Sequence, residues 1–514
     1  MAVTVKYIDN RLTTGSNDGT SAANAYRSLE AFRAGSGSGT IDVVSFVAGS
    51  GPYREVASSV KTALRTDISF DAATKTITTV AGNFTTNGFQ TGDIIRVMGS
   101  VSNDRQLTVG TVGTTTMTVN STNALIDEAA GASINIAAIT RGSNLAILDP
   151  GGNGTAARPR RWLFNGVEID GGVTLNAANG YTWTRSAANS DEWYVKRSDG
   201  SNPSLIQPFC GLMDNVFIND SADLDPDMGT VGSLSGASPM GWGDNDSIGF
   251  NTVYVRSDEN PGTRTIRVGQ VYAGISTTWQ YHSFEDGIFT LTTRDAAQSS
   301  SRGVGISNRS TTQWWIKRCL FKYMSMHAIE QGNTGFTLAE SNLTYFTGHR
   351  GYSVSANGEL TVVNAVDYGS HLFANYASGL TSSAKLTIRN SIGMWNEAGA
   401  IAKPSSSAVL VEDHNIWWPR FGASGSALGY TSTANWTTTD ATDYPPSAAT
   451  TISTQAANLA AGGIDPQFMN PATLDFRAMA SQAKWSGKPV QFARDRDNRR
   501  FSPVHPSRGS YEFV

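Results

Sequence analysis

The feature that most constrains the fold of this chain is an internal repeat between about Gln313 and Trp418, with a period of roughly 22 to 27 residues. Each repeat contains short β-like runs bounded by Gly, Asn or Ser, such as Thr361–Val363 and Lys385–Ile388. A period of this length, with three short strands per unit, is typical of one coil of a parallel β-helix. The leucine-rich repeat has a similar period, but the leucine and asparagine positions that it requires are missing.

Aligning the repeats produces two columns of side chains. The first column is aromatic, and the second holds three of the six histidines in the chain. The aligned residues are Tyr323, Tyr345, Tyr368 and Trp395 in the first column, and His327, His349, His371 and Glu397 in the second. Equivalent side chains of neighbouring coils lie about 4.8 Å apart, so we expect each column to form a ladder along the solenoid. Stacked tyrosines in such a fold more often pack in a core than bind a ligand.

We therefore predict an all-β protein: a parallel β-helix with two inserted small β modules and a C-terminal cap. Alternating strands punctuated by turn residues indicate the first insert, and a block dense in Trp, Tyr, Asp and Gly indicates the second. The expected segments are an N-terminal cap with the first coils (1–64), an inserted module (65–136), further coils (137–180), a second module (181–268), the main β-helix (269–424) and a C-terminal cap region (425–514).

Composition and charge exclude several classes of function. Charged residues make up 16% of the chain and the net charge is −4, which gives no cationic field for binding nucleic acid or an anionic membrane. No apolar stretch is long enough for a membrane-spanning helix, and Met1–Asn10 does not have the pattern of a secretory signal. Cys210 and Cys319 form neither a disulfide framework nor a zinc motif. No motif indicates a cofactor or a metal.

Both ends of the chain carry familiar segments. Tyr7–Asp9, the loop Ser16–Ser21, and Ala25–Leu29 resemble the opening of right-handed parallel β-helix proteins related to polysaccharide lyases and glycosidases. That opening usually ends in a short amphipathic helix that plugs the solenoid. Asp465–Phe468, Asp475–Arg477 and Gly509–Phe513 resemble the closing segment of the same group, and the block before Val268 resembles a module that interrupts some β-helical glycosidases. The resemblance implies a right-handed β-helix and a polysaccharide as ligand.

The first insert resembles a different family. Ile68–Ala73, Gly88–Ile95 and Glu128–Ala132 look like a module common in virion proteins of tailed bacteriophages. This resemblance implies a virion structural protein of tailspike or receptor-binding type, made in the host cytoplasm, that contacts a host surface polysaccharide and could cleave it. Its partners would be that glycan and other virion proteins. A homotrimer is expected by analogy with β-helical phage spikes.

Two other functions stay open. Coil-forming sequence begins within about ten residues of Met1 and leaves no obvious tail-attachment domain, which favours a non-enzymatic decoration protein of a capsid or tail. A bacterial polysaccharide-active glycosidase or lyase is the third candidate, and the absence of a recognisable export signal disfavours it.

A glycosidase needs two carboxyl groups, about 5 to 5.5 Å apart for retention or 6.5 to 9.5 Å apart for inversion. Stacked coils can supply such separations, and the candidate catalytic residues are Glu285, Asp286, Glu330 and Glu397. Glu397 is favoured because it continues the histidine column beside Trp395, which could act as a sugar platform. The plain alternative is that each of these residues is a solvated loop carboxylate.

A lyase would instead use basic residues to neutralise a uronate and remove its proton. The candidate substrate-binding residues are His327, His349, Arg350, His371 and Trp395. No Asp cluster for calcium is evident, so a glycoside hydrolase is favoured over a calcium-dependent lyase. Stacked imidazoles could also share a metal ion, and the structural alternative is a ladder of polar side chains bonded along the solenoid.

Overall fold

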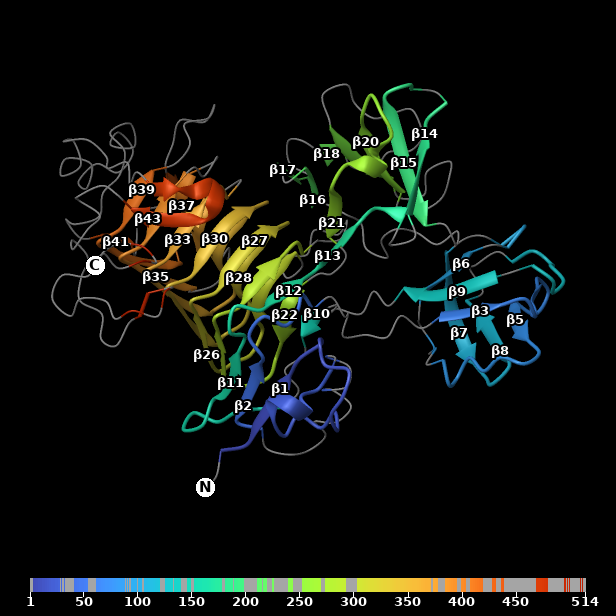
Figure 1. Ribbon diagram of the computed structural model, residues 1–514, viewed down its shortest axis with the longest axis horizontal. Helices are drawn as coiled ribbons and strands as arrows, with labels where there is room; N and C mark the ends of the chain where they lie inside the picture. Colours follow the sequence, from blue (N-terminus) through green and yellow to red (C-terminus); the bar gives the residue numbers. More distant parts are fainter. Residues whose placement is uncertain are drawn as a thin grey trace.

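The computed structural model (Figure 1) describes residues 3–32, 41–53, 62–197, 210–225, 240–243, 252–292, 303–418, 428–430, 436–438 and 468–478, apart from short gaps within several of these ranges. It also describes Arg494, Asp495, Asp497, Arg499, Gly509 and Tyr511. Within these residues the regular structure is almost entirely β. No helix among them is long and apolar enough to cross a membrane.

Three parallel sheets form the main body. The ten-stranded sheet contains β1 (Val5–Ile8), β2 (Val43–Phe46), β11 (Arg160–Leu163), β23 (His282–Glu285), β26 (Gln313–Lys317), β29 (Phe336–Glu340), β32 (Glu359–Val363), β35 (Lys385–Arg389), β38 (Val409–Asp413) and β41 (Trp436–Thr438). The seven-stranded sheet contains β12 (Glu168–Asp170), β24 (Ile288–Thr290), β27 (Leu320–Met324), β30 (Leu343–Thr347), β33 (Val366–Tyr368), β36 (Ile392–Met394) and β39 (Ile416–Trp418). The eight-stranded sheet contains β10 (Ala146–Leu148), β22 (Ala273–Thr277), β25 (Val304–Asn308), β28 (His327–Gln331), β31 (Arg350–Val354), β34 (Phe373–Ala377), β37 (Gly399–Lys403) and β40 (Leu428–Tyr430).

Each coil from β23 to β40 contributes one strand to each sheet, as β26, β27 and β28 do before β29 begins the next coil. The prediction of an all-β protein built on a parallel β-helix is confirmed. Inward-facing positions of the ten-stranded sheet alternate with outward ones, so Trp314 and Ile316 are fully buried while Trp315 and Lys317 are not. The interior is rich in aromatic rings, among them Phe289 stacked on Phe321 at 5.1 Å between ring centroids.

A two-residue corner joins the ten-stranded sheet to the seven-stranded sheet in successive coils. The first residue of the corner has a left-handed backbone conformation, with φ between 50° and 60°, at Asp286, Arg318, Ser341, Asn364, Asn390 and His414. Asn and Asp adopt this conformation more readily than most residues. The second residue can bond to the neighbouring coil: the Asn342 carboxamide oxygen accepts from the Cys319 backbone N–H at 2.8 Å. The corner is thus repeated and hydrogen-bonded from coil to coil.

The tyrosine ladder is present, and its register corrects one position of the alignment. Tyr323 and Tyr345 have ring centroids 5.8 Å apart, and Tyr345 stacks on Tyr368 at 5.7 Å. In the strand pairing, however, Tyr345 lies beside Lys322 and Tyr368, while Tyr323 is one residue further on with φ 61°. Trp395, predicted for the same column, lies outside the described residues.

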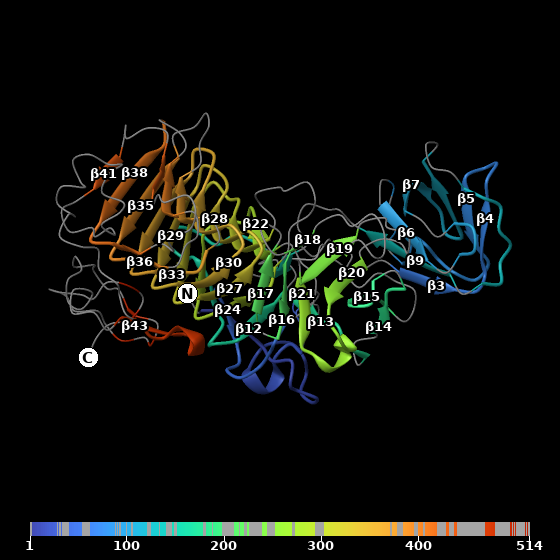
Figure 2. The same ribbon diagram turned by 90° about the horizontal axis from the view of Figure 1, so that it is seen from above.

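The C-terminal segment covers the side of the β-helix over part of the seven-stranded sheet. The hairpin of β42 (Phe468–Asn470) and β43 (Asp475–Ala478) packs on an outward apolar column (Figure 2). That column consists of Leu320, Leu343, Val366, Ile392 and Ile416, flanked by Tyr345 and Tyr368. The Phe476 ring lies 5.7 Å from Tyr345 and 5.1 Å from Tyr368. The tyrosine ladder therefore serves packing here, because the hairpin covers it.

Two modules interrupt the coils, and their strands pair antiparallel except for one parallel pair in the second module. The first contains β3 (Thr62–Arg65), β4 (Ile68–Asp71), β5 (Thr76–Thr79), β6 (Ile94–Met98), β7 (Gln106–Val112), β8 (Thr116–Val119) and β9 (Ile134–Ile139), around a core of its own. The second contains β13 (Gly172–Thr174), β14 (Tyr181–Arg185), β15 (Glu192–Arg197), β16 (Cys210–Met213), β17 (Val216–Asn219), β18 (Leu224–Asp225), β19 (Met240–Gly243), β20 (Thr252–Arg256) and β21 (Ile266–Gly269). In both views the first module lies at one end of the long axis, away from the β-helix (Figures 1 and 2).

The second module is anchored on the β-helix by an ion pair and an apolar contact. Arg267 of β21 pairs with Asp170 of β12, whose side chain is almost fully buried. Leu212 of the same module packs with Leu291 and Tyr323. At the start of the chain, Leu29 and Phe32 are helical and buried, and the Phe32 ring contacts Trp162 at 5.6 Å. These residues pack into the core of the first coils.

Phe476→Ala tests whether the hairpin stabilises the β-helix. Loss of its contacts with Tyr345, Tyr368 and Phe468 should cost about 3–5 kcal/mol and lower the thermal unfolding midpoint. Met469→Ala is the matched control, because Met469 lies in the same hairpin and is 51% exposed. Differential scanning calorimetry showing equal midpoints for the two variants would contradict the packing role.

Candidate functional site

A polar groove of about 680 Å³ lies on the outer face of the ten-stranded sheet. It spans β11, β23, β26 and β29, and a residue from the end of the chain joins its lining. The lining residues are Pro159, Arg161, Leu163, Asn165, Ser283, Glu285, Asp286, Trp315, Lys317, Arg318, Glu340 and Arg494. Four neighbouring coils thus place their outward side chains around one depression.

Strand register determines which side chains meet in the groove. Arg161, Ser283 and Trp315 pair across β11, β23 and β26, and a second row runs through Leu163, Glu285, Lys317 and Glu340. Both rows face outward because side chains on a strand alternate between the two faces of the sheet. Trp315 is half-buried in the first row, where its ring forms an apolar surface among charged groups.

Glu285 is the most heavily hydrogen-bonded carboxylate of the groove. Arg161 donates to both of its oxygens at 3.0 and 3.1 Å, the Ser283 hydroxyl donates at 2.9 Å, and Arg318 donates at 3.3 Å. Burial alone would raise the pKa of Glu285, but these donors and the charges of Arg161 and Arg318 leave the pKa below its ordinary value. Glu285 is therefore ionised at neutral pH.

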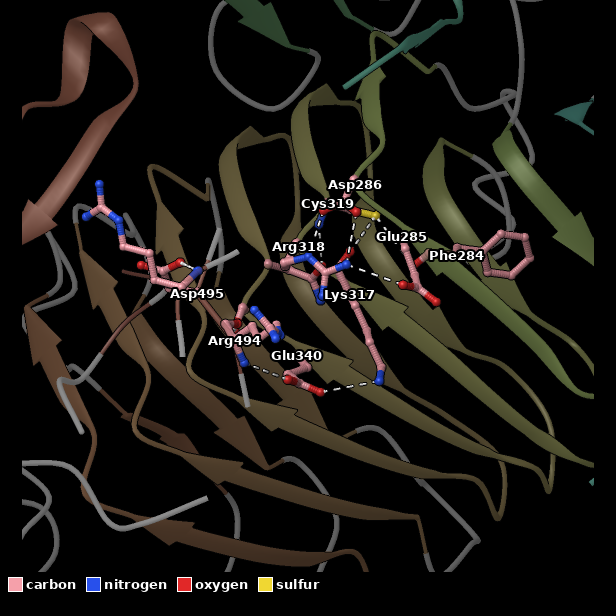
Figure 3. A network of polar contacts seen from close by, with 12 residues as sticks. Phe284, Glu285, Asp286, Lys317, Arg318, Cys319, Glu340, Arg494 and Asp495 are labelled. Carbon is pink, nitrogen blue, oxygen red and sulfur yellow. Dashed lines mark hydrogen bonds and ion pairs between the residues drawn. The ribbon is translucent and has the colours of Figure 1, made fainter. Parts of the chain in front are cut away.

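Asp286 and Arg318 occupy the left-handed corner positions of adjacent coils. Arg318 donates to the two Asp286 oxygens at 2.7 and 2.9 Å, a bidentate pair (Figure 3). Burial lowers the pKa of Arg318, but its carboxylate partners outweigh burial and hold the pKa above its ordinary value. One guanidinium therefore links both predicted carboxylates, Glu285 and Asp286, and the structure brings these two candidates together.

The C-terminal segment borders the groove beside Glu340. The Lys317 ammonium lies 3.8 Å from a Glu340 oxygen, and the Arg494 backbone N–H donates to the other oxygen at 3.3 Å (Figure 3). The Ser341 hydroxyl donates to the Arg494 carbonyl at 2.5 Å. The adjacent Asp495 is fully buried and accepts from the Arg499 backbone N–H at 2.7 Å. These bonds hold the segment against the corner of the β29 coil.

This arrangement is suited to binding a polar ligand. A glycosidase acid must keep a proton at working pH, which requires a raised pKa. The groove instead holds Glu285 as an ionised, multiply bonded carboxylate, and Asp286 in a bidentate ion pair with Arg318. Fixed carboxylates and guanidinium groups can accept from and donate to sugar hydroxyls without reorganising.

Glu330, the third predicted carboxyl, lies elsewhere, in β28 of the eight-stranded sheet. It is 1% exposed and accepts from the Ser307 hydroxyl at 2.9 Å. Burial raises the pKa of Glu330 to about 7, opposed by that hydrogen bond and by the charges of Arg309 and Arg350. The carboxyl has a pKa suited to a general acid but no exposed surface on which a glycan could meet it.

The histidine column is only partly described. His327 is fully buried and His349 half-buried, with ring centroids 5.4 Å apart. The strand partner of His327 is Arg350 and not His349, so this column is offset by one residue, as the tyrosines are. His371, Trp395 and Glu397 lie outside the described residues. Their roles, and those of His327, His349 and Arg350, stay predictions.

Sequence reasoning missed most of the groove. It selected Glu285 and Asp286 but not Arg161, Trp315, Lys317 or Arg318. The alternation of buried and outward residues in Gln313–Lys317 is the signal that could have placed Trp315 and Lys317 on the outer face. The approach of Arg494, distant in sequence, carries no such signal.

Comparisons with known proteins add little. No protein-family model matches the sequence, and no curated protein matches it. Among solved structures, the chain is similar to one titled "The complex structure of XylC with xylose", at 10% identity and a TM-score of 0.33. The match covers 58% of this chain and 61% of the other. A likeness at this level carries no argument about function.

Within the part of the chain that the structure describes, no group of three or more His, Cys, Asp or Glu side chains is placed to hold a metal ion. Cys319 is buried in the corner after Arg318. His282, another buried residue, accepts at Nδ1 from the Trp162 indole at 3.2 Å, and its Nε2 lies 3.1 Å from the Gly152 carbonyl. Burial lowers the pKa of His282 to about 3, so it is a neutral packing residue.

Glu330→Gln should change how stability depends on pH. The folded protein holds the Glu330 proton up to about pH 7, whereas the unfolded chain releases it near 4.5, so stability falls as pH rises through this window. The loss is on the order of 3 kcal/mol. The variant should therefore unfold at a higher temperature than the parent at pH 8 and at nearly the same temperature at pH 4.5.

The control for this experiment is Glu359→Gln, since the Glu359 side chain is 38% exposed in a surface pair with Lys385. Thermal melts followed by circular dichroism from pH 4.5 to 8 are the measurement. If the unfolding midpoints of the parent and of Glu330→Gln change with pH in parallel, Glu330 ionises in the folded state as it does in water.

Proposed function

We propose that this protein is a receptor-binding virion protein of a tailed bacteriophage, of tailspike type, and that the groove around Trp315 binds a host surface polysaccharide. The observation that carries the glycan part is the groove itself. Its lining combines the half-buried indole of Trp315 with the cations Arg161 and Lys317 and with carboxylates fixed by ion pairs. An apolar ring face combined with preorganised polar groups suits a sugar, which has both kinds of surface.

The β-helix gives this site its rigidity. The groove spans four parallel strands that are hydrogen-bonded in register and spaced about 4.8 Å apart. A linear polysaccharide lying along the axis could contact successive coils without the protein changing shape. A preformed site of this kind loses little entropy on binding.

Binding without cleavage is the version that the groove favours. Its central carboxylate, Glu285, is held ionised by Arg161, Ser283 and Arg318, so it is a poor proton donor. Depolymerase activity is the alternative, and it would need an acid other than Glu285. The phage origin is supported by the resemblance of Ile68–Ala73, Gly88–Ile95 and Glu128–Ala132 to a virion module. Other virion proteins as partners, and a homotrimer, are part of the proposal.

One observation favours a second candidate, the non-enzymatic decoration protein. The first module lies away from the β-helix and exposes Val101 to 88% and Ile126 to 48% (Figure 1). Hydrogen bonds fix the loops that carry them: the Val101 backbone N–H donates to Glu128 at 3.0 Å, and the Ile126 N–H donates to Asn103 at 2.9 Å. Rigidly held apolar side chains of this kind suit docking on another protein.

Trp315→Ala should weaken binding to a bacterial capsular polysaccharide at least about tenfold, which corresponds to roughly 1.4 kcal/mol. Phe336→Ala is the matched control, because Phe336 is a half-buried aromatic on the same outer face but outside the groove lining. Both variants should keep the circular dichroism spectrum of the parent. The two variants are compared on a panel of capsular and lipopolysaccharide fractions. If Trp315→Ala and Phe336→Ala bind them with equal affinity, the groove is not the glycan-binding site.

The same panel separates binding from cleavage. After prolonged incubation, the parent protein should release neither new reducing ends nor unsaturated uronates from a fraction that it binds. Release that is lost in Glu285→Gln would show that the groove is an active site and that the binding-only version is wrong.

A further inference from the structure

The charged side chains of the groove lie at two depths. The side chains of Arg161 and Lys317 are 50% and 30% exposed, whereas those of Glu285 and Glu340, the carboxylates they pair with, are 10% and 13% exposed. In these two pairs the cation lies nearer to solvent than its partner, whereas in the third pair Arg318 is 10% exposed and Asp286 is 36% exposed. A ligand that approaches Arg161 or Lys317 meets positive charge before it meets Glu285 or Glu340.

The cations also differ in how tightly they are held. Arg161 and Arg318 each form a bidentate pair with a carboxylate, at distances between 2.7 and 3.1 Å. The ion pair of Lys317 with Glu340 is 3.8 Å long, beyond the range of a charge-assisted hydrogen bond. The Arg494 backbone N–H bonds the other Glu340 oxygen. Of these three cations, Lys317 is therefore the one that a ligand can separate from its carboxylate partner at the lowest cost in free energy.

The charges of the residues that line the groove also favour an anionic ligand. Among the described residues, the groove is lined by the cationic residues Arg161, Lys317, Arg318 and Arg494 and by the acidic residues Glu285, Asp286 and Glu340. The balance of these described lining residues is positive by one charge, although the whole chain has a net charge of −4. A positive depression on a negatively charged protein concentrates anionic ligands at that place.

We infer that the glycan of the groove is acidic and that Lys317 binds its carboxylate. This inference rests on the proposed function, because it assigns the class of sugar to the same groove. Trp315 and Lys317 are two residues apart on β26 and face the same side, about 7 Å from one another along the strand. A pyranose ring packed on the indole would place an exocyclic carboxylate within reach of the flexible lysine side chain.

The test compares one glycan in two forms. A panel of uronate-containing capsular polysaccharides is prepared both native and with its carboxyl groups chemically reduced to alcohols. The parent protein should bind the native form about two- to fivefold more tightly than the reduced form, the range expected for one accessible ion pair. This preference should shrink as salt is raised, because the interaction is screened.

Lys317→Met should abolish the preference, so that the variant binds the native and the reduced form with equal affinity. Lys385→Met is the matched control, since Lys385 lies on the same outer face in a tight pair with Glu359 at 2.7 Å and outside the groove lining. It should keep the full preference.

The outcomes are distinct. Equal binding of native and reduced glycan by the parent would overturn the inference while leaving the groove as a glycan site. A preference that survives in Lys317→Met would also overturn it, because the anion would then be bound elsewhere. If the parent binds no member of the panel in either form, the proposed function itself is wrong and the inference falls with it.

Discussion

The whole structure depends on the in-register pairing of parallel strands, which repeats one corner conformation from coil to coil. At the end of six strands of the ten-stranded sheet, β23, β26, β29, β32, β35 and β38, the backbone turns through a left-handed residue, and backbone N–H groups of these corners bond to the adjacent coil. Because the register is kept, every side chain has an equivalent one strand away. The interior aromatics, the tyrosine ladder and the rows of the groove all follow from that one constraint.

The groove lies where charged residues occupy equivalent positions in neighbouring coils. Asp286 and Arg318 are corner residues of neighbouring coils, so the register brings them into a bidentate pair. Glu285 and Lys317 precede them and face outward in the next row. A change of period in these coils would separate the four residues. The site is therefore a property of the stacking and not of any single loop.

The sequence predicts the architecture well because the repeat is a long-range signal that many residues share. It predicts Glu285 and Asp286 as candidate carboxylates but not the groove in which they lie, since their partners Arg161 and Arg318 are contributed by other coils. The one-residue offset of Tyr323 and His327 from their assigned columns arises because the paired strands repeat every 23 residues here (Lys322 beside Tyr345, His327 beside Arg350), whereas Tyr323 and Tyr345, like His327 and His349, are 22 residues apart. The hairpin on Tyr345 and Tyr368 and the approach of Arg494 depend on tertiary packing of a distant segment, for which the repeat carries no signal.

Charge pairing decides what the groove can do. The donors around Glu285 stabilise the ionised form of its carboxyl group and lower its pKa. The donors that fix its position therefore also leave it without a proton to donate at neutral pH. Glu330 shows the opposite balance. Its burial, with a single hydroxyl donor, raises its pKa so that the carboxyl group keeps its proton, but the same burial prevents a substrate from reaching it. For Glu285 and Glu330, access to the outer face and a retained proton thus exclude one another. This balance supports the proposal that the groove recognises a chain of sugars without cutting it.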